Sequence, residues 1–306
     1  MAEHKLTWKM RLMGAWMHLH GLMPLGYHRA WAHGIAAVVD KLFHYREAVI
    51  LKNLRNAFPN KPEAEIQRLK KRFYLHFATI LTETVWFSAC RGPWGRRRLH
   101  RSHIVELTNP EELNRLYNGA RQLMLLQSHT GNWELIGGIL QYFYGTEPAI
   151  SADAFAVTYL RLHSDLWDAL MARGRTAPVA DLGFGGYVET SQVMRYVLQR
   201  REQKFGYSFI TDQYPYTGAH VPVEFMHQPT VMMVGAASLA CKLDMAVAYL
   251  RFECREGGGY RMTVVPLSPH AGGEDPQALM KRYFKLLEED LEQQPWNYLW
   301  SHNRWK

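Results

Sequence analysis

The sequence has little cysteine and no long uncharged apolar run, and each scarcity argues against a class of protein. Only three cysteines, Cys90, Cys241 and Cys254, occur among 306 residues, and none belongs to a CxxC pair or another metal-ligand spacing. This usage argues against a disulfide framework or a zinc cluster and fits a reducing compartment. No uncharged apolar stretch reaches the roughly 18 residues that an ordinary membrane-spanning helix needs.

The abundant residues describe a large, basic, globular chain. Hydrophobic residues make up 47% of the sequence and charged residues 21%, which allows the chain to bury a full core. Lys and Arg number 36 against 28 Asp and Glu, so the net charge of +8 favours an acidic partner: anionic lipid, an acidic carrier protein or nucleic acid. Residues 91–103 gather five arginines around Trp94 without any nucleic-acid-binding module, so we predict no nucleic-acid partner.

The amino-terminal region mixes Trp, Met and Leu with Lys, Arg and His over residues 6–43, and Pro24 divides it into two pieces. This pattern is typical of helices that lie in a membrane interface, with Trp8, Trp16 and Trp31 at the level of the lipid headgroups. The alternative is a helical hairpin that packs against the body of the protein itself.

The remaining patterns predict an α/β fold preceded by helices. From Glu63 onward, apolar residues recur at helical spacing, so residues 1–90 form a helical amino-terminal region that we expect to associate with a membrane. Residues 91–306 alternate short apolar runs with helical patterns, which indicates a largely parallel or mixed central sheet flanked by helices. We expect this catalytic region and the helices to form one compact unit.

The segment SHTGNWEL, residues 128–135, lies at the joint between two apolar runs. If residues 122–127 form a strand and residues 133–140 begin a helix, His129 lies just past the carboxyl end of the strand. That edge is where α/β proteins build their ligand crevices.

His129 and Glu134 are the candidate catalytic pair of this segment. Gly131 permits a tight bend and Asn132 is a preferred helix cap, so the two side chains can meet across the turn. A histidine that is braced by a buried carboxylate can take a proton from an alcohol or amine. The alternative is a polar turn with a helix cap. Ser128 is not expected to act as a nucleophile, because no GxSxG pattern surrounds it.

A second polar pair, Asp212 and Gln213, follows the strand-like run FGYSFIT. Because this run also ends at a carboxyl edge, the pair can approach the same crevice as His129 and bind substrate or the His129 loop. An Asx turn that caps a loop before Pro215 is the alternative.

Four segments in order resemble the lipid A biosynthesis acyltransferase family of the late lauroyl or myristoyl type. They are REAVILKNLRNAFPN, HTGNWE, DQYPYTGAHVPVEF and the ending YLWSHNRWK, and the resemblance covers about residues 20 to 306. In that family the histidine of the second segment is the general base and the acidic residue is its partner. The resemblance therefore implies these roles for His129 and Glu134, on a fold of the glycerolipid-acyltransferase type.

The resemblance also implies the substrates and their place in the cell. The donor is an acyl thioester, usually on acyl carrier protein, and the acceptor is a hydroxyl of a lipid at the cytoplasmic face of the inner membrane. We expect the chain to be peripheral or anchored there by its amino terminus. An activated thioester needs a base and oxyanion donors but neither metal nor cofactor. Candidate donors are backbone N–H groups at Gly131, Asn132 and Trp133.

One position departs from the family pattern. Family members commonly carry a cation directly after a tyrosine in the next segment, whereas here Leu160 follows Tyr159 and Arg161 comes one residue later. Arg161 is a candidate substrate contact, and an exposed arginine at a helix start is the alternative.

The expected function is thus transfer of a fatty acyl chain to a membrane lipid, by direct attack without an acyl-enzyme. The acceptor is a lipid A precursor or, alternatively, an aminolipid or another glycolipid. A thioesterase that uses the same base on water is a rival interpretation. A non-catalytic membrane-binding protein is the rival from a different class.

Overall fold

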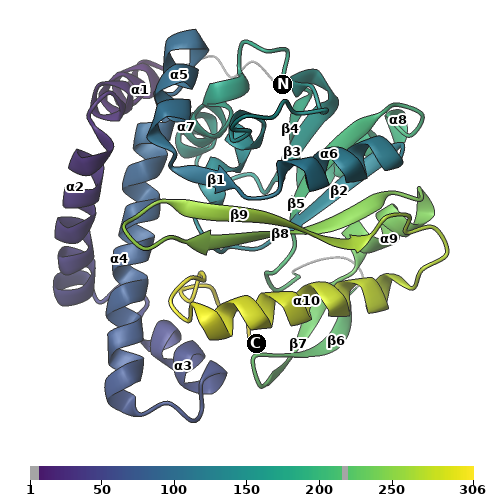
Figure 1. Cartoon of the computed structure of the whole chain (residues 1–306). Helices are drawn as coiled ribbons and strands as arrows, with labels where there is room; N and C mark the ends of the chain where they lie inside the picture. Colours follow the sequence, from purple (N-terminus) through teal and green to yellow (C-terminus); the bar gives the residue numbers. More distant parts are fainter. Residues whose placement is uncertain (1–6, 216–219) are drawn as a thin grey trace.

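A computed structural model describes residues 7–215 and 220–306, and it confirms the α/β fold. A seven-stranded, mostly parallel sheet carries helices on its two faces, and a group of helices at the amino terminus stands along one side (Figure 1). The strand order is β1-β9-β8-β2-β5-β3-β4. Strands β8, β2, β5, β3 and β4 run parallel, while β9 is antiparallel to β8 and β1 is parallel to β9.

The strands of the large sheet are β1 (Val105–Leu107), β2 (Gln122–Gln127), β3 (Phe155–Tyr159), β4 (Gly186–Glu189), β5 (Phe205–Ile210), β8 (Ala246–Cys254) and β9 (Tyr260–Ser268). A separate antiparallel pair consists of β6 (His220–Phe225) and β7 (Gln228–Met233).

The first four α-helices are α1 (Trp8–Gly21), α2 (Leu25–Val38), α3 (Glu47–Ala57) and α4 (Glu63–Ser88), with a π-helical turn η1 (Val39–Phe43) after α2. Pro24, where the sequence predicts a break, is the residue before α2. Helix α4 buries Phe73 and Ile80, as their helical spacing predicts. In the described part of the chain, every helix is too short or too polar to cross a membrane.

The later helices are α5 (Gly92–Ser102), α6 (Pro110–Gly119), α7 (Asp165–Arg175), α8 (Val193–Gln199), α9 (Gly235–Lys242) and α10 (Pro276–Gln293), with short 3-10 helices η2 (Trp133–Gln141), η3 (Ala152–Ala154), η4 (Ala177–Val179) and η5 (Thr190–Gln192). The start of α10 is set by its cap. The Asp275 carboxylate accepts hydrogen bonds from the backbone N–H groups of Gln277 and Ala278, and Pro276 occupies the first turn.

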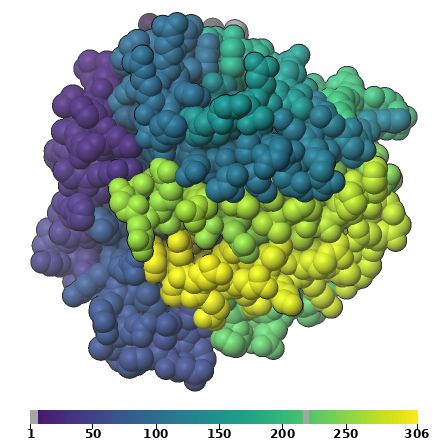
Figure 2. Space-filling view, viewed as in Figure 1, coloured from purple at the N-terminus to yellow at the C-terminus, as the bar shows by residue number. Residues whose placement is uncertain are grey.

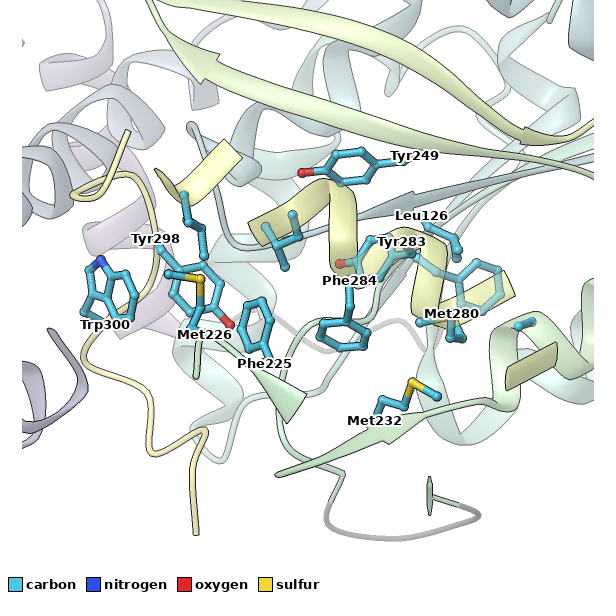
Figure 3. Packing of buried hydrophobic residues seen from close by; sticks show 14 of the residues in the cluster. Leu126, Phe225, Met226, Met232, Tyr249, Met280, Tyr283, Phe284, Tyr298 and Trp300 are labelled. Carbon is cyan, nitrogen blue, oxygen red and sulfur yellow. The ribbon is translucent and has the colours of Figure 1, made fainter. Parts of the chain in front are cut away.

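Strand β2 is the centre of the core, because all six of its residues are buried. Its alternating side chains divide the core into two layers: Met124 and Leu126 belong to the layer that contains α10, and Leu123 and Leu125 belong to the opposite one. Figure 3 shows Leu126 beside the α10 aromatic residues in the first layer. Burying each such leucine stabilises the fold by about 1.5–3 kcal/mol.

The segment expected to start an α-helix after His129 differs from the prediction, because it forms the 3-10 helix η2. Gly137 explains part of this difference. A Cβ atom at that position would lie 1.8 Å from the carbonyl oxygen of Arg175, so η2 packs directly on the backbone at the end of α7. Two consecutive glycines, Gly137 and Gly138, also lower the local α-helix propensity.

Candidate functional site

The pairing of β2 with β5 places His129 opposite Asp212. The two strands are parallel neighbours whose last paired residues are Gln127 and Ile210. The same register, extended by two residues, brings His129 and Asp212 side by side past the carboxyl edge of the sheet. The imidazole Nδ1 lies 2.8 Å from Oδ1 of Asp212.

His129 is the accessible residue of an otherwise buried run. Residues 122–140 are all buried except His129, whose side chain is 16% exposed, while the Asp212 side chain is 1% exposed. On the other side of the ring, Nε2 lies 3.2 Å from the side-chain nitrogen of Gln213. An N–H on Nδ1 that donates to Asp212 leaves Nε2 as the acceptor, turned toward the open side of the site.

Asp212 remains a carboxylate in this setting. Burial alone would raise the pKa of Asp212, but the charge of His129, its hydrogen bond and backbone N–H groups lower that pKa below its ordinary value. The buried carboxylate therefore stabilises a protonated imidazole at position 129, as an orienting acid does in a catalytic triad.

Contrary to the prediction, Glu134 makes no hydrogen bond to His129 in the described structure; its partners are Trp133 and Arg175. Arg175, at the end of α7, binds Glu134 through two guanidinium nitrogens, with Nη2 at 2.6 Å from Oε1 and Nε on Oε2. The Tyr187 hydroxyl accepts from the same guanidinium at 2.6 Å. The reason is electrostatic: a buried carboxylate needs a charged partner, and Arg175 supplies a bidentate one while Asp212 already occupies His129.

Glu134 instead reaches His129 through Trp133. The indole N–H of Trp133 donates to Oε1 of Glu134 at 3.0 Å. The Trp133 ring packs edge-on against the imidazole, with ring centroids 5.1 Å apart and planes at 68°. Glu134 thus fixes the orientation of the ring that forms one wall of the His129 site.

Residues that are distant in sequence hold the turn between His129 and Trp133 through hydrogen bonds. Gly131 has a φ of +58°, and its backbone N–H donates to the Asn297 side chain at 2.6 Å. The Asn132 side chain makes no cap hydrogen bond in η2; it donates to the buried Glu83 at 3.1 Å. Because Asn297 occupies the N–H of Gly131, this group is unavailable as an oxyanion donor, contrary to the prediction.

The carboxyl-terminal segment supports the Asp212 loop in the same way. Arg304 is fully buried, and its Nε donates to the backbone carbonyl of Asp212 at 2.6 Å. Helix α3 holds this segment in turn, since Asn53 donates to the carbonyls of Trp300 and His302 at 2.8 and 3.0 Å. The four sequence segments singled out above therefore converge on one site, although residues 216–219 of the third lie outside the described residues.

The other candidates occupy different surroundings. Arg161 is exposed and forms an ion pair with Asp165, 2.7 Å away on the same stretch of chain, and no contact joins it to His129. Trp300 and Trp305 of the carboxyl-terminal segment are buried in the core. The sequence analysis did not predict roles for Arg175, Asn297 and Asn53. Asn53 lies within the family-like segment REAVILKNLRNAFPN and Asn297 directly precedes YLWSHNRWK, which is the one signal that could have found these two asparagines.

Comparison with known protein families identifies the chain. The model of the family described as bacterial lipid A biosynthesis acyltransferase matches residues 2–306, nearly the whole sequence. Among curated proteins no similar sequence is found.

Gly131 gives a direct test of how tightly the turn is held. An added Cβ would lie 2.5 Å from Cγ of Phe252, and the positive φ disfavours any L side chain. We expect Gly131→Ala to lower the free energy of unfolding by about 2 kcal/mol or more, from the backbone conformation and the close contact together. Urea unfolding measures this loss. Gly119→Ala, at a glycine with open space around it, is the matched control, and equal effects of the two would contradict the assignment.

Proposed function

Because the chain belongs to the bacterial lipid A biosynthesis acyltransferase family, we propose that it moves a fatty acyl chain from an acyl carrier protein thioester to a hydroxyl of a membrane lipid, with His129 as general base. The observation that carries this proposal is the pair formed by His129 and the buried Asp212. The pair supplies a base whose second nitrogen is open to substrate, and Asp212 takes the orienting role that the sequence assigned to Glu134.

The reaction needs one base, used twice. The acceptor hydroxyl replaces Gln213 at Nε2 of His129 and gives up its proton there, while its oxygen bonds to the thioester carbonyl carbon. The resulting tetrahedral oxyanion collapses, the carbon–sulfur bond breaks, and the thiolate takes the proton back from His129. Asp212 stabilises the imidazolium between the two steps.

Direct transfer, without an acyl-enzyme, is supported by the surroundings of Ser128. This serine is buried, and its hydroxyl is hydrogen-bonded to Thr130 at 2.8 Å. It therefore lacks both the exposure and the base that a serine nucleophile requires. The backbone N–H groups of Asn132 and Trp133, at the start of η2, are the candidate donors to the oxyanion.

The amino-terminal helices supply a surface that suits a lipid membrane. Exposed apolar side chains cover α1, α2 and η1, among them Trp8 at 69%, Trp16 at 51% and Trp31 at 54%. These helices form one side of the molecule, purple in Figure 2, and pack against α4. Aromatic rings at this density beside Lys9 and Arg11 are typical of helices lying in the interface. We propose that this surface holds the enzyme at the cytoplasmic face of the inner membrane.

Helix α5 is the proposed docking element for the acidic carrier protein. Arg91, Arg97 and Arg101 are exposed on and next to it, whereas Arg98 is used internally to bind the carbonyls of Gly21 and Met23. Through Arg98, helix α5 is attached to the turn between α1 and α2. A carrier bound there would deliver its thioester beside the membrane surface, and this contact would weaken as salt rises.

The acceptor and the rival activities are separated by product analysis. A lipid A precursor is the proposed acceptor, and acylation of an aminolipid or another glycolipid instead would replace it with the second candidate. Release of free fatty acid in the absence of any lipid would favour a thioesterase. A purified protein that transforms none of several acyl thioesters in a total lipid extract would favour the non-catalytic alternative.

Three substitutions test the roles of the site residues. His129→Ala removes the base, so we expect transfer from acyl carrier protein to fall by about 10³-fold.

Asp212→Asn removes the charge beside the imidazolium, so the rate falls by about 10²-fold and the acid limb of the pH–rate profile moves to lower pH. Glu134→Gln acts only through Trp133, so we expect about a tenfold loss and an unchanged acid limb.

Lipid mass spectrometry over a pH series measures these changes, with urea unfolding to identify variants that lose stability. Glu134→Gln alone leaves the buried Arg175 without its carboxylate partner. The double variant Glu134→Gln with Arg175→Gln is therefore the matched control, because it leaves no unpaired buried charge at this ion pair. Full activity in His129→Ala, or an acid limb that shifts in Glu134→Gln as it does in Asp212→Asn, would contradict the assignment.

Membrane attachment through α1 and α2 is tested by removing the three exposed tryptophans. We expect the triple variant Trp8→Ser, Trp16→Ser and Trp31→Ser to bind phospholipid vesicles at least about tenfold more weakly, because each indole loses a large buried area at the interface. Co-sedimentation with vesicles measures the change. Met194→Ser with Leu198→Ser, on the exposed face of α8 at the opposite side of the molecule, is the control (Figure 1). Equal losses in both variants would refute the assigned surface.

A further inference from the structure

A cleft of about 510 Å³ lies on the side of the His129 loop that faces α2 and α4. Arg29 and His33 of α2, Arg72 and His76 of α4, and Arg255 in the turn between β8 and β9 line it, together with Trp296. These segments meet on the face shown in Figure 2, where the purple, blue, lime and yellow parts of the chain adjoin. None of the hydrogen-bond or ring partners of His129 lines this cleft.

Three guanidinium groups enter the cleft from three different elements, and their own partners satisfy them only in part. Arg72 stacks its guanidinium on Trp296, 3.1 Å from the ring centroid, and within residues 7–215 and 220–306 no carboxylate lies within ion-pair distance of it. Arg29 lies 3.6 Å from the Glu83 carboxylate. Arg255 pairs with Glu106 at 3.1 Å, while its Nε is buried without a hydrogen-bond partner.

The carboxylates in and beside the cleft leave Arg72 without an ion-pair partner. Glu256 is exposed at the rim, in the turn between β8 and β9. Glu83 is buried, and Tyr260 and Asn132 donate to its Oε2 at 2.7 and 3.1 Å. Counting Glu106 beside the cleft, three carboxylates and three arginines balance formally, but the carboxylates are placed unevenly. Glu83 lies next to Arg29 and Glu106 pairs with Arg255, so among the three arginines of the cleft Arg72 is the one without a carboxylate within ion-pair distance in the described residues.

A buried histidine, His76, also lines the cleft. The exposed fraction of His76 is only 7%, and its Nε2 has no hydrogen-bond partner in the described structure. Burial lowers the pKa of His76 to about 4, so the ring is neutral at physiological pH. The ring nitrogen of His76 and the Nε–H of Arg255 are both buried beside the cleft without a hydrogen-bond partner, and a bound polar ligand would satisfy them.

We propose that this cleft binds a phosphate group. Phosphate offers oxygens in several directions, which suits guanidinium groups arriving from α2, α4 and the turn between β8 and β9, and arginine is well matched to phosphate geometry. The volume exceeds that of the phosphate itself, so the cleft has room for a group attached to it. The source is a lipid headgroup or a soluble phosphate compound. Arg29 and His33 lie on α2, one of the helices that carry the proposed membrane surface, so the cleft adjoins these helices.

The cleft is connected to the His129 loop through Glu83. Arg29 and Asn132 are both partners of this carboxylate, one in the cleft and the other in the turn that carries His129. A phosphate that draws Arg29 toward itself changes the charge balance at Glu83. Occupancy of the cleft therefore alters the support of the turn without any contact to His129.

Binding to the full chain tests the proposal, with inorganic phosphate and vesicles as the two probes. Calorimetric titration with sodium phosphate measures the soluble arm, and sedimentation with phosphatidylcholine vesicles, with and without phosphatidic acid, measures the lipid arm. We expect Arg72→Gln to weaken binding of the responsive probe by about tenfold, because a charge-assisted contact is lost. Arg68→Gln, one turn earlier on α4 and outside the cleft, is the matched control, expected to stay within about twofold.

Hydrogen exchange localises the binding. The responsive probe should slow amide exchange in residues 255–260 and in the adjacent part of α4, and this protection should be absent in Arg72→Gln. Response to inorganic phosphate supports a soluble source, and response only to phosphatidic acid supports a headgroup. Binding of neither probe, equal losses in Arg72→Gln and Arg68→Gln, or protection confined to α1 and α2 would overturn the proposal. Because acyl transfer is not the readout, these outcomes are independent of the proposed enzymatic function.

Discussion

The hydrogen bond between His129 and Asp212 is the interaction on which the site depends, and it follows from strand pairing. Strands β2 and β5 are parallel neighbours, so residues that follow them at equal distance meet at the same edge. The surrounding sheet buries Asp212 while leaving the imidazole partly open. Burial makes the carboxylate a strong partner for the ring, because no water competes for it, and the opening leaves the second nitrogen free for substrate.

A buried charged pair at a loop requires support, and the last residues of the chain provide it. Asn297 holds the turn at Gly131, and Arg304 holds the carbonyl of Asp212. Both loops that make the pair are thus attached to one carboxyl-terminal segment, which is itself packed into the core through Trp300 and bound by α3. This arrangement explains why segments at positions 46–60 and 298–306 share the family resemblance with the residues next to the reaction, although they lie outside it.

The elements of the fold were predictable, while the pairing of their ends was not. The buried run of β2 and the helical spacing in α4 are local patterns, and each forms as predicted. The sequence did indicate that Asp212 and Gln213 can approach the His129 loop, and both lie at its ring. The choice between Asp212 and Glu134 as the partner of His129 depends on which strand lies beside β2, and no local pattern contains that information. Glu134, five residues away, was therefore the natural choice. It pairs instead with Arg175, from a different helix. The division at residue 90 and the catalytic roles stay predictions.

The tautomer of His129 tests the central claim most directly. Nitrogen-15 shifts of the selectively labelled ring distinguish a proton on Nδ1 from a proton on Nε2 in the neutral imidazole. The account predicts that Nδ1 carries the proton, donated to Asp212, and that Nε2 is the free base. It further predicts that this preference is lost when Asp212 is replaced by Asn. A neutral ring protonated on Nε2, unaffected by the replacement, would contradict the account.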